Sequence, residues 1–232
     1  MKNYSKIFFF LSLFFLLARH LAADELTVMV YNLRNYFVKE DGYTPFKEDS
    51  SKAAMAKMIK SVYPDIFMAT EVGGEKSIAD LAALLKENDC AYPYIKMIEG
   101  EDDSRHLVLF SKIPPSEFSP RTEMAYKIKV KDAELTEDVR VQRGFMHAVF
   151  AFPNGYRLHV ISAHLKSKMF NSRYNQTDMR RYEARLLRYF VNEILEKEPD
   201  ANVLVMGYMN DTYDSEPIRF LRDDKKTPEK RL

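Results

Sequence analysis

The spacing of hydrophobic and polar positions predicts alternating strands and helices in the first part of the chain. The predicted elements are a strand at 25–33, a helix at 49–62, a strand at 65–72 and a helix at 75–88. The helical segments carry apolar residues three and four positions apart, whereas the strands alternate or are apolar throughout. The two strands end at Asn32 and Glu71, and Pro64 stops the first helix. This order favours sheets faced by helices over an all-β sandwich.

The remainder of the chain has a different hydrophobic pattern, in which short apolar runs follow one another with turns between them. Strands are predicted at 105–115, 125–131, 144–152 and 156–165, then a helix at 177–196, a strand at 203–206 and a helix at 215–221. The charged run 129–140 is interpreted as a solvated hairpin loop rather than a binding site. The pattern predicts an α/β (α+β) fold, with sheets rich in antiparallel pairs packed between helices.

An apolar run at 7–18 follows Lys2 and Lys6 near the start of the sequence. Its length fits the roughly 7 to 15 residues of a secretory signal and falls short of the ~20 that a helix needs to span a bilayer. Residues 1–23 are therefore predicted to be a signal peptide, with an uncleaved membrane anchor as the alternative. Cleavage would give an exported protein, periplasmic or secreted, without stable membrane association.

The mature chain, 24–232, fits a single domain with its own core, since it contains no Pro/Ser-rich linker and no internal repeat. The formal net charge of +1 gives no general attraction to nucleic acid or anionic membrane, so any site for a polyanion must be local. Cys90 is the only cysteine in the sequence, so the fold cannot rely on an internal disulfide. Cys90 is expected to be a buried, small apolar residue.

Four predicted strands end in polar residues that an apolar strand does not need. They are Asn32, Glu71, His164 with Lys166, and Asn210 with Asp211. Carboxylate, amide and imidazole groups gathered at a sheet edge suit a hard divalent cation and a phosphate. One carboxylate with amide oxygens matches Mg²⁺, which keeps several waters and takes one or two protein carboxylates beside substrate phosphate. Zinc is a poorer match, because the 5 histidines lack ligand spacing.

Six blocks of sequence resemble the endonuclease/exonuclease/phosphatase superfamily and occur in its order. They are VYNLRNYF at 30–37, PDIFMATEVGG at 64–74, LVLFSKIP at 107–114, LHVISAHLKSK at 158–168, RRYEARLL at 180–187 and VLVMGYMNDTYDSEPI at 203–218. The resemblance covers nearly all of the mature chain. It implies a four-layer sandwich of two mixed, largely antiparallel β-sheets packed face to face and flanked by helices, and metal-dependent hydrolysis of phosphoesters. It does not select a substrate, because this scaffold cuts DNA, RNA, phosphoinositides and sphingomyelin. A nuclease acting on nucleic acid is the favoured interpretation.

The resemblance also implies roles for the residues at the strand ends. Glu71 would be the direct ligand of Mg²⁺, with Mn²⁺ as a substitute. Asn32 would lie beside both the metal and the phosphate. His164 would contact the oxygens of the scissile phosphate, and Asn210 would help to hold the phosphate or the attacking water.

Two cations complete the implied site. Arg143 stands where the family often places a phosphate-facing residue, with a solvated arginine at the start of a strand as the alternative. Lys166 would add electrostatic support. The implied mechanism is in-line attack by a metal-associated water, with the cation and the donors offsetting charge on the phosphorus.

The chain departs from the family pattern in two places. The family block Gly-Asp-hydrophobe-Asn is GYMN here, so Tyr208 replaces the aspartate that orients and helps to deprotonate the water. A phenol with a pKa of ~10 is a poor base near neutral pH and a poor Mg²⁺ ligand, and Asp211 is expected to point elsewhere.

The second departure is at the C-terminal side, where the resemblance implies further strands ending in an Asp-His pair. No histidine follows His164 in this sequence. General acid and base catalysis commonly contributes about 10²- to 10⁴-fold, so both departures put turnover in question. The alternative hypothesis is a catalytically dead family member that binds phosphate or polyanions, or a degenerate gene product.

Overall fold

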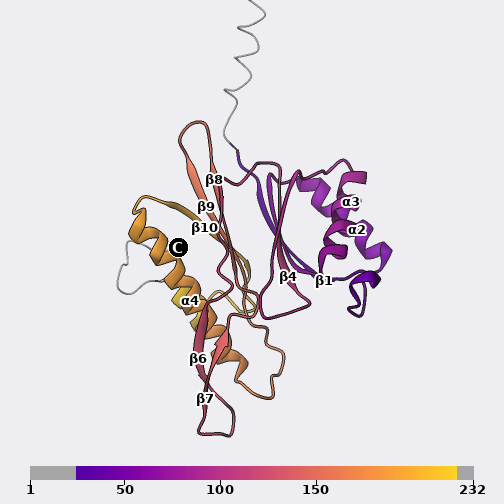
Figure 1. Cartoon of the computed structure of the whole chain (residues 1–232). Helices are drawn as coiled ribbons and strands as arrows, with labels where there is room; N and C mark the ends of the chain where they lie inside the picture. The colour runs from indigo at the N-terminus through magenta and orange to yellow at the C-terminus, as the bar shows by residue number, and fades with distance from the viewer. Residues whose placement is uncertain (1–24, 224–232) are drawn as a thin grey trace, which may run out of the picture.

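Two four-stranded sheets lie face to face in the computed structural model, which describes residues 25–223 (Figure 1). The first sheet has the order β1 (Val28–Tyr36), β2 (Ile66–Val72), β4 (His106–Ser111) and β3 (Tyr94–Ile98). The second sheet has the order β10 (Asn202–Tyr208), β9 (Arg157–His164), β8 (Phe145–Ala151) and β5 (Glu117–Phe118). Each sheet has one parallel pair and two antiparallel pairs, which confirms the predicted mixed, largely antiparallel sheets.

Helices make the connections between the parallel strands. α2 (Asp49–Val62) lies between β1 and β2, and α4 (Gln176–Lys197) lies between β9 and β10. The 3₁₀ turn η2 (Lys39–Asp41) precedes α2. Parallel neighbours need such crossovers, because a tight turn joins only antiparallel strands. The carboxyl ends of β1 and β2 therefore meet at one edge of the first sheet, and those of β9 and β10 meet at one edge of the second.

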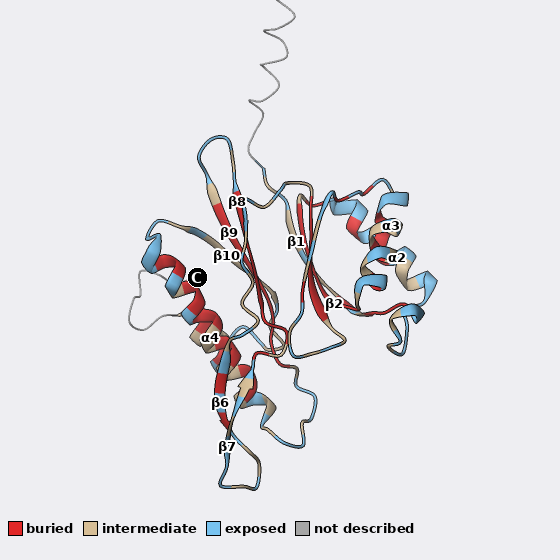
Figure 2. Ribbon diagram, viewed as in Figure 1, coloured by how far each residue is buried: buried red, intermediate tan, exposed pale blue. Residues whose placement is uncertain are grey.

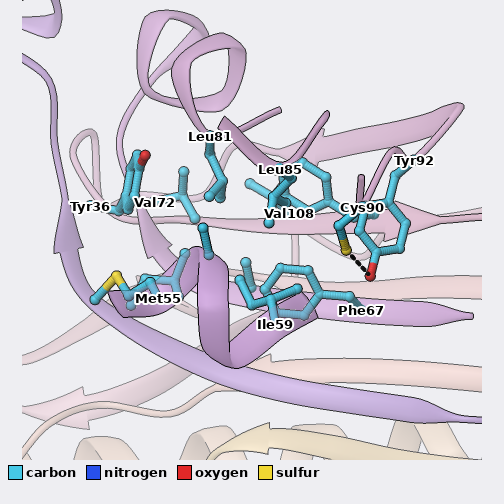
Figure 3. Packing of buried hydrophobic residues seen from close by; sticks show 14 of the residues in the cluster. Tyr36, Met55, Ile59, Phe67, Val72, Leu81, Leu85, Cys90, Tyr92 and Val108 are labelled. Atoms are coloured by element: carbon cyan, nitrogen blue, oxygen red, sulfur yellow. Dashed lines mark hydrogen bonds between the residues drawn. The ribbon is translucent and has the colours of Figure 1, made fainter. Parts of the chain in front are cut away.

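Helices also cover the outer face of each sheet, which completes the four layers (Figure 2). α2 and α3 (Glu75–Glu87) pack on the first sheet, where Ile59, Leu81 and Leu85 are buried with Phe67 (Figure 3). Cys90 belongs to this cluster and is fully buried, as predicted. α4 and α5 (Glu216–Arg222) cover the second sheet. The cluster beneath them includes Phe145, Ile161, Leu187, Val191 and Leu221.

The middle of the sandwich is a separate apolar core between the two sheets. The first sheet contributes Ile66, Met68, Leu107 and Leu109, and the second contributes Met146, Ala148, Phe150, Leu158 and Val160. Alternate residues of each strand thus point to the helices or to the opposite sheet, as the period of two requires. The strands are therefore apolar on both faces, which explains their continuous apolar runs.

A two-stranded hairpin departs from the prediction of a loop. Residues 129–140 are predicted to be a solvated hairpin loop. The hairpin is present, but part of this segment is a strand, because β7 (Thr136–Arg140) pairs with β6 (Ala125–Lys129). Alternate positions of β6 are buried, because Tyr126 and Ile128 pack with Met179 of α4. Most of the charged side chains lie on the other face and in the turn, which accounts for the polar appearance of the segment.

Other differences concern strand boundaries. β1 continues past Asn32 to Tyr36, with irregular pairing between these two residues, and β3 and β5 were not predicted. The predicted signal peptide, 1–23, lies outside the described residues. No helix within residues 25–223 is long and apolar enough to cross a membrane.

Candidate phosphate and cation site

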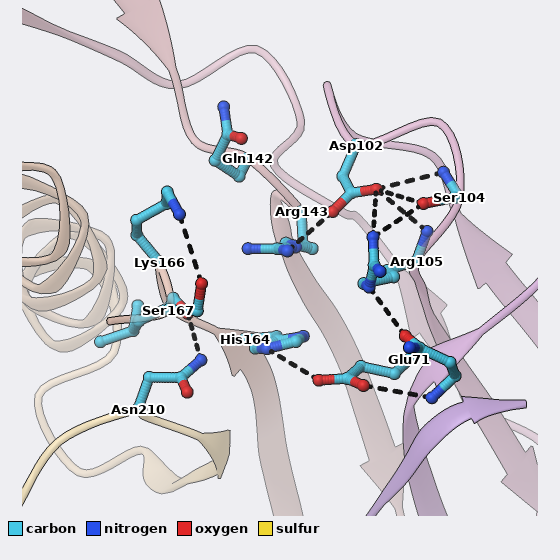
Figure 4. A network of polar contacts seen from close by, with 12 residues as sticks. Glu71, Asp102, Ser104, Arg105, Gln142, Arg143, His164, Lys166, Ser167 and Asn210 are labelled. Atoms are coloured by element: carbon cyan, nitrogen blue, oxygen red, sulfur yellow. Dashed lines mark hydrogen bonds and ion pairs between the residues drawn. The ribbon is translucent and has the colours of Figure 1, made fainter. Parts of the chain in front are cut away.

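Polar side chains from both sheets meet where β1, β2 and β9 end (Figure 4). Oε1 of Glu71, on β2, lies 3.6 Å from Nε2 of His164 at the end of β9. Asn32 donates from Nδ2 to the same carboxylate oxygen at 2.9 Å. The backbone N–H of Asn35 donates to the other carboxylate oxygen at 3.1 Å. The structure therefore brings together three residues that the sequence nominated, Asn32, Glu71 and His164.

The backbone around this site adopts a conformation that residues other than glycine rarely occupy. Arg34, Asn35, Glu71 and Asn210 have φ angles of 50°, 59°, 58° and 56°. Left-handed positions of this kind cost free energy and cluster at functional sites, where the surrounding structure holds them in place. Here the left-handed turn after Asn32 directs the Asn35 N–H toward the Glu71 carboxylate.

The environment of His164 keeps its imidazole neutral. Burial, and then the neighbouring Arg143 guanidinium, lower the pKa of His164 to about 3. The 3.6 Å contact with Glu71 is therefore made by a neutral ring and is not an ion pair near pH 7. Nδ1 of His164 is buried and has no hydrogen-bond partner among residues 25–223.

Arg143 belongs to the same network of polar contacts and has unused hydrogen-bonding capacity (Figure 4). Its Nη2 lies 2.7 Å from Oδ2 of Asp102, and the side chain is almost fully buried. Nε and Nη1 of Arg143 are buried without a partner in the described part of the chain. Buried polar groups are normally hydrogen-bonded, so these two guanidinium nitrogens call for a partner beyond the described residues, either an ordered water or an anion.

The loop between β3 and β4 supplies residues that the sequence did not nominate. Oδ1 of Asp102 accepts hydrogen bonds from the backbone N–H and the hydroxyl of Ser104. Burial alone would raise the pKa of Asp102, but the Arg143 guanidinium and the Ser104 hydrogen bonds outweigh it and lower this pKa. Arg105 donates from Nε to Oδ1 of Asn35 at 2.8 Å, which ties this loop to the end of β1.

Glu183 on α4 holds two site segments at once. Its Oε1 accepts from the backbone N–H of Gln142 at 3.2 Å, and its Oε2 accepts from the backbone N–H of Lys166 at 2.6 Å. The carboxyl group is fully buried, and burial raises its pKa. Because Gln142 precedes Arg143, this one side chain sets the separation between the backbones that carry Arg143 and Lys166.

Arg180, one turn before Glu183, fixes the segment after β10. Its Nε donates to Oδ2 of Asp211 at 2.7 Å, and Nη1 donates to the Lys166 carbonyl at 3.2 Å. Asp211 also lies 3.0 Å from Nζ of Lys168, so its carboxylate is held in ion pairs. Asn210 donates from Nδ2 to the carbonyl of Leu165 at 2.8 Å. The structure therefore places Asn210 beside the end of β9, where the sequence predicted a role for it.

Tyr208 lies next to His164, with its ring edge-on to the imidazole at 5.6 Å between ring centres. The Tyr208 side chain is 46% exposed. Gly207 lets β10 approach β9 closely, because a Cβ at this position would lie 1.9 Å from the Ala163 carbonyl oxygen. The tyrosine thus occupies the strand end where the family resemblance leads one to expect a carboxylate.

The donor set, a carboxylate with amide oxygens, fits a cation that prefers oxygen ligands better than it fits zinc. No three His, Cys, Asp or Glu side chains in the range 25–223 are grouped so that they could hold a metal ion. Both oxygens of Glu71 already accept hydrogen bonds, but an ionised carboxylate has about four lone-pair sites and can also bind a cation. The amide oxygen of Asn32 accepts the Arg34 N–H at 2.8 Å, so its role beside a metal stays a prediction. These residues fit Mg²⁺ or Mn²⁺ completed by water and phosphate oxygens.

A sequence model of the Endonuclease/Exonuclease/phosphatase family matches residues 27–231. The chain belongs to this family. The match extends over both sheets and all the site residues described above. A search of curated protein sequences finds no match.

Three solved structures share the fold of this chain. Truncated TDP2 from Caenorhabditis elegans is 19% identical, with a TM-score of 0.51 over 81% of this chain and 63% of that chain. Sphingomyelinase C from Streptomyces griseocarneus is 16% identical, with a TM-score of 0.58 over 86% of this chain and 69% of that chain. An endonuclease/exonuclease/phosphatase family protein from Bacteroides thetaiotaomicron is 17% identical, with a TM-score of 0.54 over 84% and 67%.

These structural likenesses establish the fold and not the activity. The chain spans 48% to 63% of the length of the three C. elegans TDP2 structures. At such low identity a shared fold does not carry a shared substrate, because one fold hosts many activities. The activity of this family member is therefore argued from its own site residues.

Proposed function

We propose that this chain is an exported, metal-dependent phosphoesterase that hydrolyses phosphodiester bonds in nucleic acid. The observation that carries the proposal is the pair of buried, unused guanidinium nitrogens of Arg143. They lie in one polar network with His164 and the Glu71 carboxylate (Figure 4). An anion-binding group beside a cation ligand is the arrangement that phosphoester hydrolysis needs.

Each residue has a distinct part in this proposal. Arg143 would bind two phosphate oxygens through Nε and Nη1, and neutral His164 would donate one hydrogen bond to the same phosphate. Lys166 would add positive charge, and Asn210 would orient the phosphate or the attacking water. Glu71 would hold a Mg²⁺ or Mn²⁺ ion. When bound, this ion would supply positive charge that offsets the charge developing on the phosphate oxygens.

A second candidate function follows from Tyr208. No aspartate lies at the end of β10 to accept the proton of the water, and a tyrosine has no negative charge near neutral pH. A protein with Arg143 and His164 in place but without a general base would bind phosphate groups and turn them over slowly. We therefore propose phosphate or polyanion binding without catalysis as the alternative function.

One assay separates the two functions. The purified chain would be given a single-stranded and a double-stranded DNA substrate with Mg²⁺, with Mn²⁺ and with EDTA, and acid-soluble nucleotide would be measured. The phosphoesterase hypothesis predicts cation-dependent release of nucleotide. The rate of release should fall about 100-fold or more in Glu71→Gln, which is the loss expected when a main charge-stabilising group is removed. Glu75→Gln, at an exposed position nearby on α3, is the matched control.

Binding of the same DNA in EDTA tests the alternative. Salt-sensitive binding that weakens in Arg143→Ala and not in exposed Arg140→Ala, without any release of nucleotide, would establish the non-catalytic function. If a folded sample neither releases nucleotide nor binds DNA, both proposals are wrong.

A further inference from the structure

Two adjacent apolar side chains protrude from the loop between β9 and α4. Phe170 is 80% exposed and Met169 is 75% exposed, which makes them the most exposed large apolar residues in the described range. Isolated apolar residues on a surface are normal. An adjacent pair this exposed, in a loop that leads away from the phosphate site, calls for a specific explanation.

The loop that carries this pair is held in place by hydrogen bonds. Oδ1 of Asn171 accepts from the backbone N–H groups of Arg173 and Tyr174 at 2.9 and 2.8 Å, which closes a local turn. Lys131, in the turn of the β6–β7 hairpin, donates from Nζ to the Asn171 carbonyl at 2.6 Å and from its backbone N–H to the Arg173 carbonyl at 2.9 Å. Phe170 is therefore presented by an ordered loop.

The loop lies on the same end of the molecule as the phosphate site. It begins directly after β9, and it projects beyond that end together with the β6–β7 hairpin (Figure 1). Phe170 follows Lys166 by four residues, so the two Cα atoms are at most ~14 Å apart. A polymer whose phosphate is bound at Arg143 and Lys166 is thus within a few monomer lengths of Phe170.

The chemistry around Phe170 combines an aromatic face with positive charge. Nζ of Lys131 lies 4.6 Å from the centre of the Phe170 ring. Lys168, beside Met169, has a side chain that is 60% exposed. Aromatic rings next to cations bind single-stranded nucleic acid, because bases stack on the ring while the cations follow the backbone.

The apolar surface formed by Met169 and Phe170 is small, which favours a nucleic-acid base over a lipid surface as its binding partner. Stable attachment to a membrane takes two independent signals, and two apolar side chains on one short loop supply less than that. One ring suffices for stacking one base. Lys131 and Phe170 come from segments that only the fold brings together, so the sequence alone does not reveal this pairing.

We propose that Phe170 is a stacking platform for a base of single-stranded nucleic acid, with Lys131 and Lys168 beside the strand and its phosphate held at Arg143. This inference rests on the proposed function and names the substrate class of that site. It requires that the strand be unpaired near the bound phosphate, since a paired base does not expose its face.

The absence of tryptophan from the sequence gives a direct test. Phe170→Trp introduces a single tryptophan, whose fluorescence would be followed during titration with single-stranded oligothymidylate in EDTA. Stacking predicts saturable quenching. Tyr156→Trp is the matched control, because Tyr156 is exposed but precedes β9 at the end opposite His164, about 26 Å away along the strand. This control is expected to show no quenching.

Affinity measurements on a second pair of variants separate stacking from simple apolar contact. Phe170→Ala is expected to weaken oligothymidylate binding by about 5- to 150-fold, the usual contribution of one stacked base. Phe170→Leu keeps an apolar side chain without a ring and is expected to weaken binding to a similar extent. Equal affinity in wild type and Phe170→Ala would overturn the inference.

Three outcomes distinguish a failure of the stacking inference from a failure of the proposed function. Cleavage or binding of DNA that depends on Arg143 but not on Phe170 would overturn the stacking inference and leave the proposed function standing. A wild-type chain that neither binds nor cleaves nucleic acid would overturn both. A blue shift of the tryptophan fluorescence of the Phe170→Trp variant with phosphatidylglycerol vesicles, and no response to oligothymidylate, would replace nucleic acid with a lipid surface.

Discussion

Oε1 of Glu71 lies 3.6 Å from Nε2 of His164, and this contact joins the two sheets of the sandwich. Glu71 is on the first sheet and His164 is on the second. Neither sheet alone carries both the Glu71 carboxylate and the His164 imidazole. The site therefore exists only when the two halves of the fold are packed together.

Tyr208→Asp should raise phosphodiesterase activity. The change would place a carboxylate at the end of β10, beside His164, where a general base is missing. We expect an increase of about 10²- to 10⁴-fold in the Mg²⁺-dependent rate at neutral pH, the usual contribution of such a base. Because the Tyr208 side chain is 46% exposed, the free energy of unfolding should change little.

Tyr213→Asp is the matched control for this experiment, because Tyr213 is 72% exposed and lies in the following loop. It should leave the rate unchanged. A folded Tyr208→Asp protein with no gain in rate would show that groups elsewhere limit catalysis.

Glu183→Ala should destabilise the protein and weaken phosphate binding together. The change leaves the backbone N–H groups of Gln142 and Lys166 without their acceptor. Each unsatisfied buried donor costs about 1–3 kcal/mol, so the free energy of unfolding in urea should fall by roughly 2–6 kcal/mol for the two donors. Inorganic phosphate, measured by titration calorimetry, should bind more weakly because Arg143 and Lys166 lose their fixed separation.

Glu183→Gln retains one acceptor oxygen at this position and should show a smaller loss on both measurements. Glu196→Ala, at an exposed position of α4, should change neither quantity. If Glu183→Ala lost stability but kept the full affinity for phosphate, the positioning role of Glu183 would be wrong.

A buried pair of histidines should make stability sensitive to acid. Nε2 of His147 lies 3.2 Å from Nδ1 of His159, beneath Phe190 of α4. Burial, and then His159, lower the pKa of His147 to about 4. The other charged groups that influence it are Glu117, Arg121 and Glu198.

The direction of the effect follows from proton binding. Between pH 6.5 and about 4, His147 takes up a proton in the unfolded chain but not in the folded protein. The contribution of His147 to the free energy of unfolding is therefore fully present above pH 6.5. It is lost as the pH falls through this window, by an amount on the order of a few kcal/mol. Urea midpoints at pH 7 and pH 4.5 should differ less in His147→Gln than in wild type. Equal differences in the two proteins would refute this assignment.

Gly207→Ala should be far more damaging than Gly155→Ala. Both glycines have positive φ angles, 147° and 84°, so alanine is strained at either position. A Cβ at Gly207 would lie 1.9 Å from the Ala163 carbonyl oxygen, whereas nothing lies within 4 Å of a Cβ at Gly155. Gly155→Ala should cost about 1–2 kcal/mol. Gly207→Ala should exceed that cost or prevent folding, as thermal unfolding would show; equal melting temperatures would contradict the close approach of β10 to β9.

The sequence was sufficient to predict most of the fold. The period of the apolar positions located all the long helices and the central strands, because those elements bury a continuous stripe or run. β3 and β5 were missed for physical reasons. β5 has only 2 residues, and β3 is an edge strand whose residues from Tyr94 to Lys96 are exposed or half-buried. Neither leaves the apolar signal of a central strand.

The candidate site could be predicted only in part. Strand-end positions nominated Asn32, Glu71 and His164, and the fold brings these residues together. Asp102 and Arg105 come from a polar loop, and only their tertiary contacts with Arg143 and Asn35 connect them to the site. A local pattern does not record contacts of this kind.

Glu183 was not nominated from the sequence, although it lies on the buried face of α4. This buried stripe runs through Met179, Glu183 and Leu187. An acidic residue four positions from each of two buried apolar residues was the available signal, since a carboxylate inside such a stripe needs partners.

The apolar layer between the sheets determines how far apart the two sheets lie, and with it the distance between Glu71 and His164. Met68 and Leu109 on one side and Met146 and Val160 on the other fill the gap between the two sheets. Packed interiors transmit changes of even one methylene group. The gap between the Glu71 carboxylate and the His164 imidazole can therefore be widened or narrowed from inside the protein, by side chains that never touch a phosphate. Selection on this layer would tune the chemistry as well as the stability.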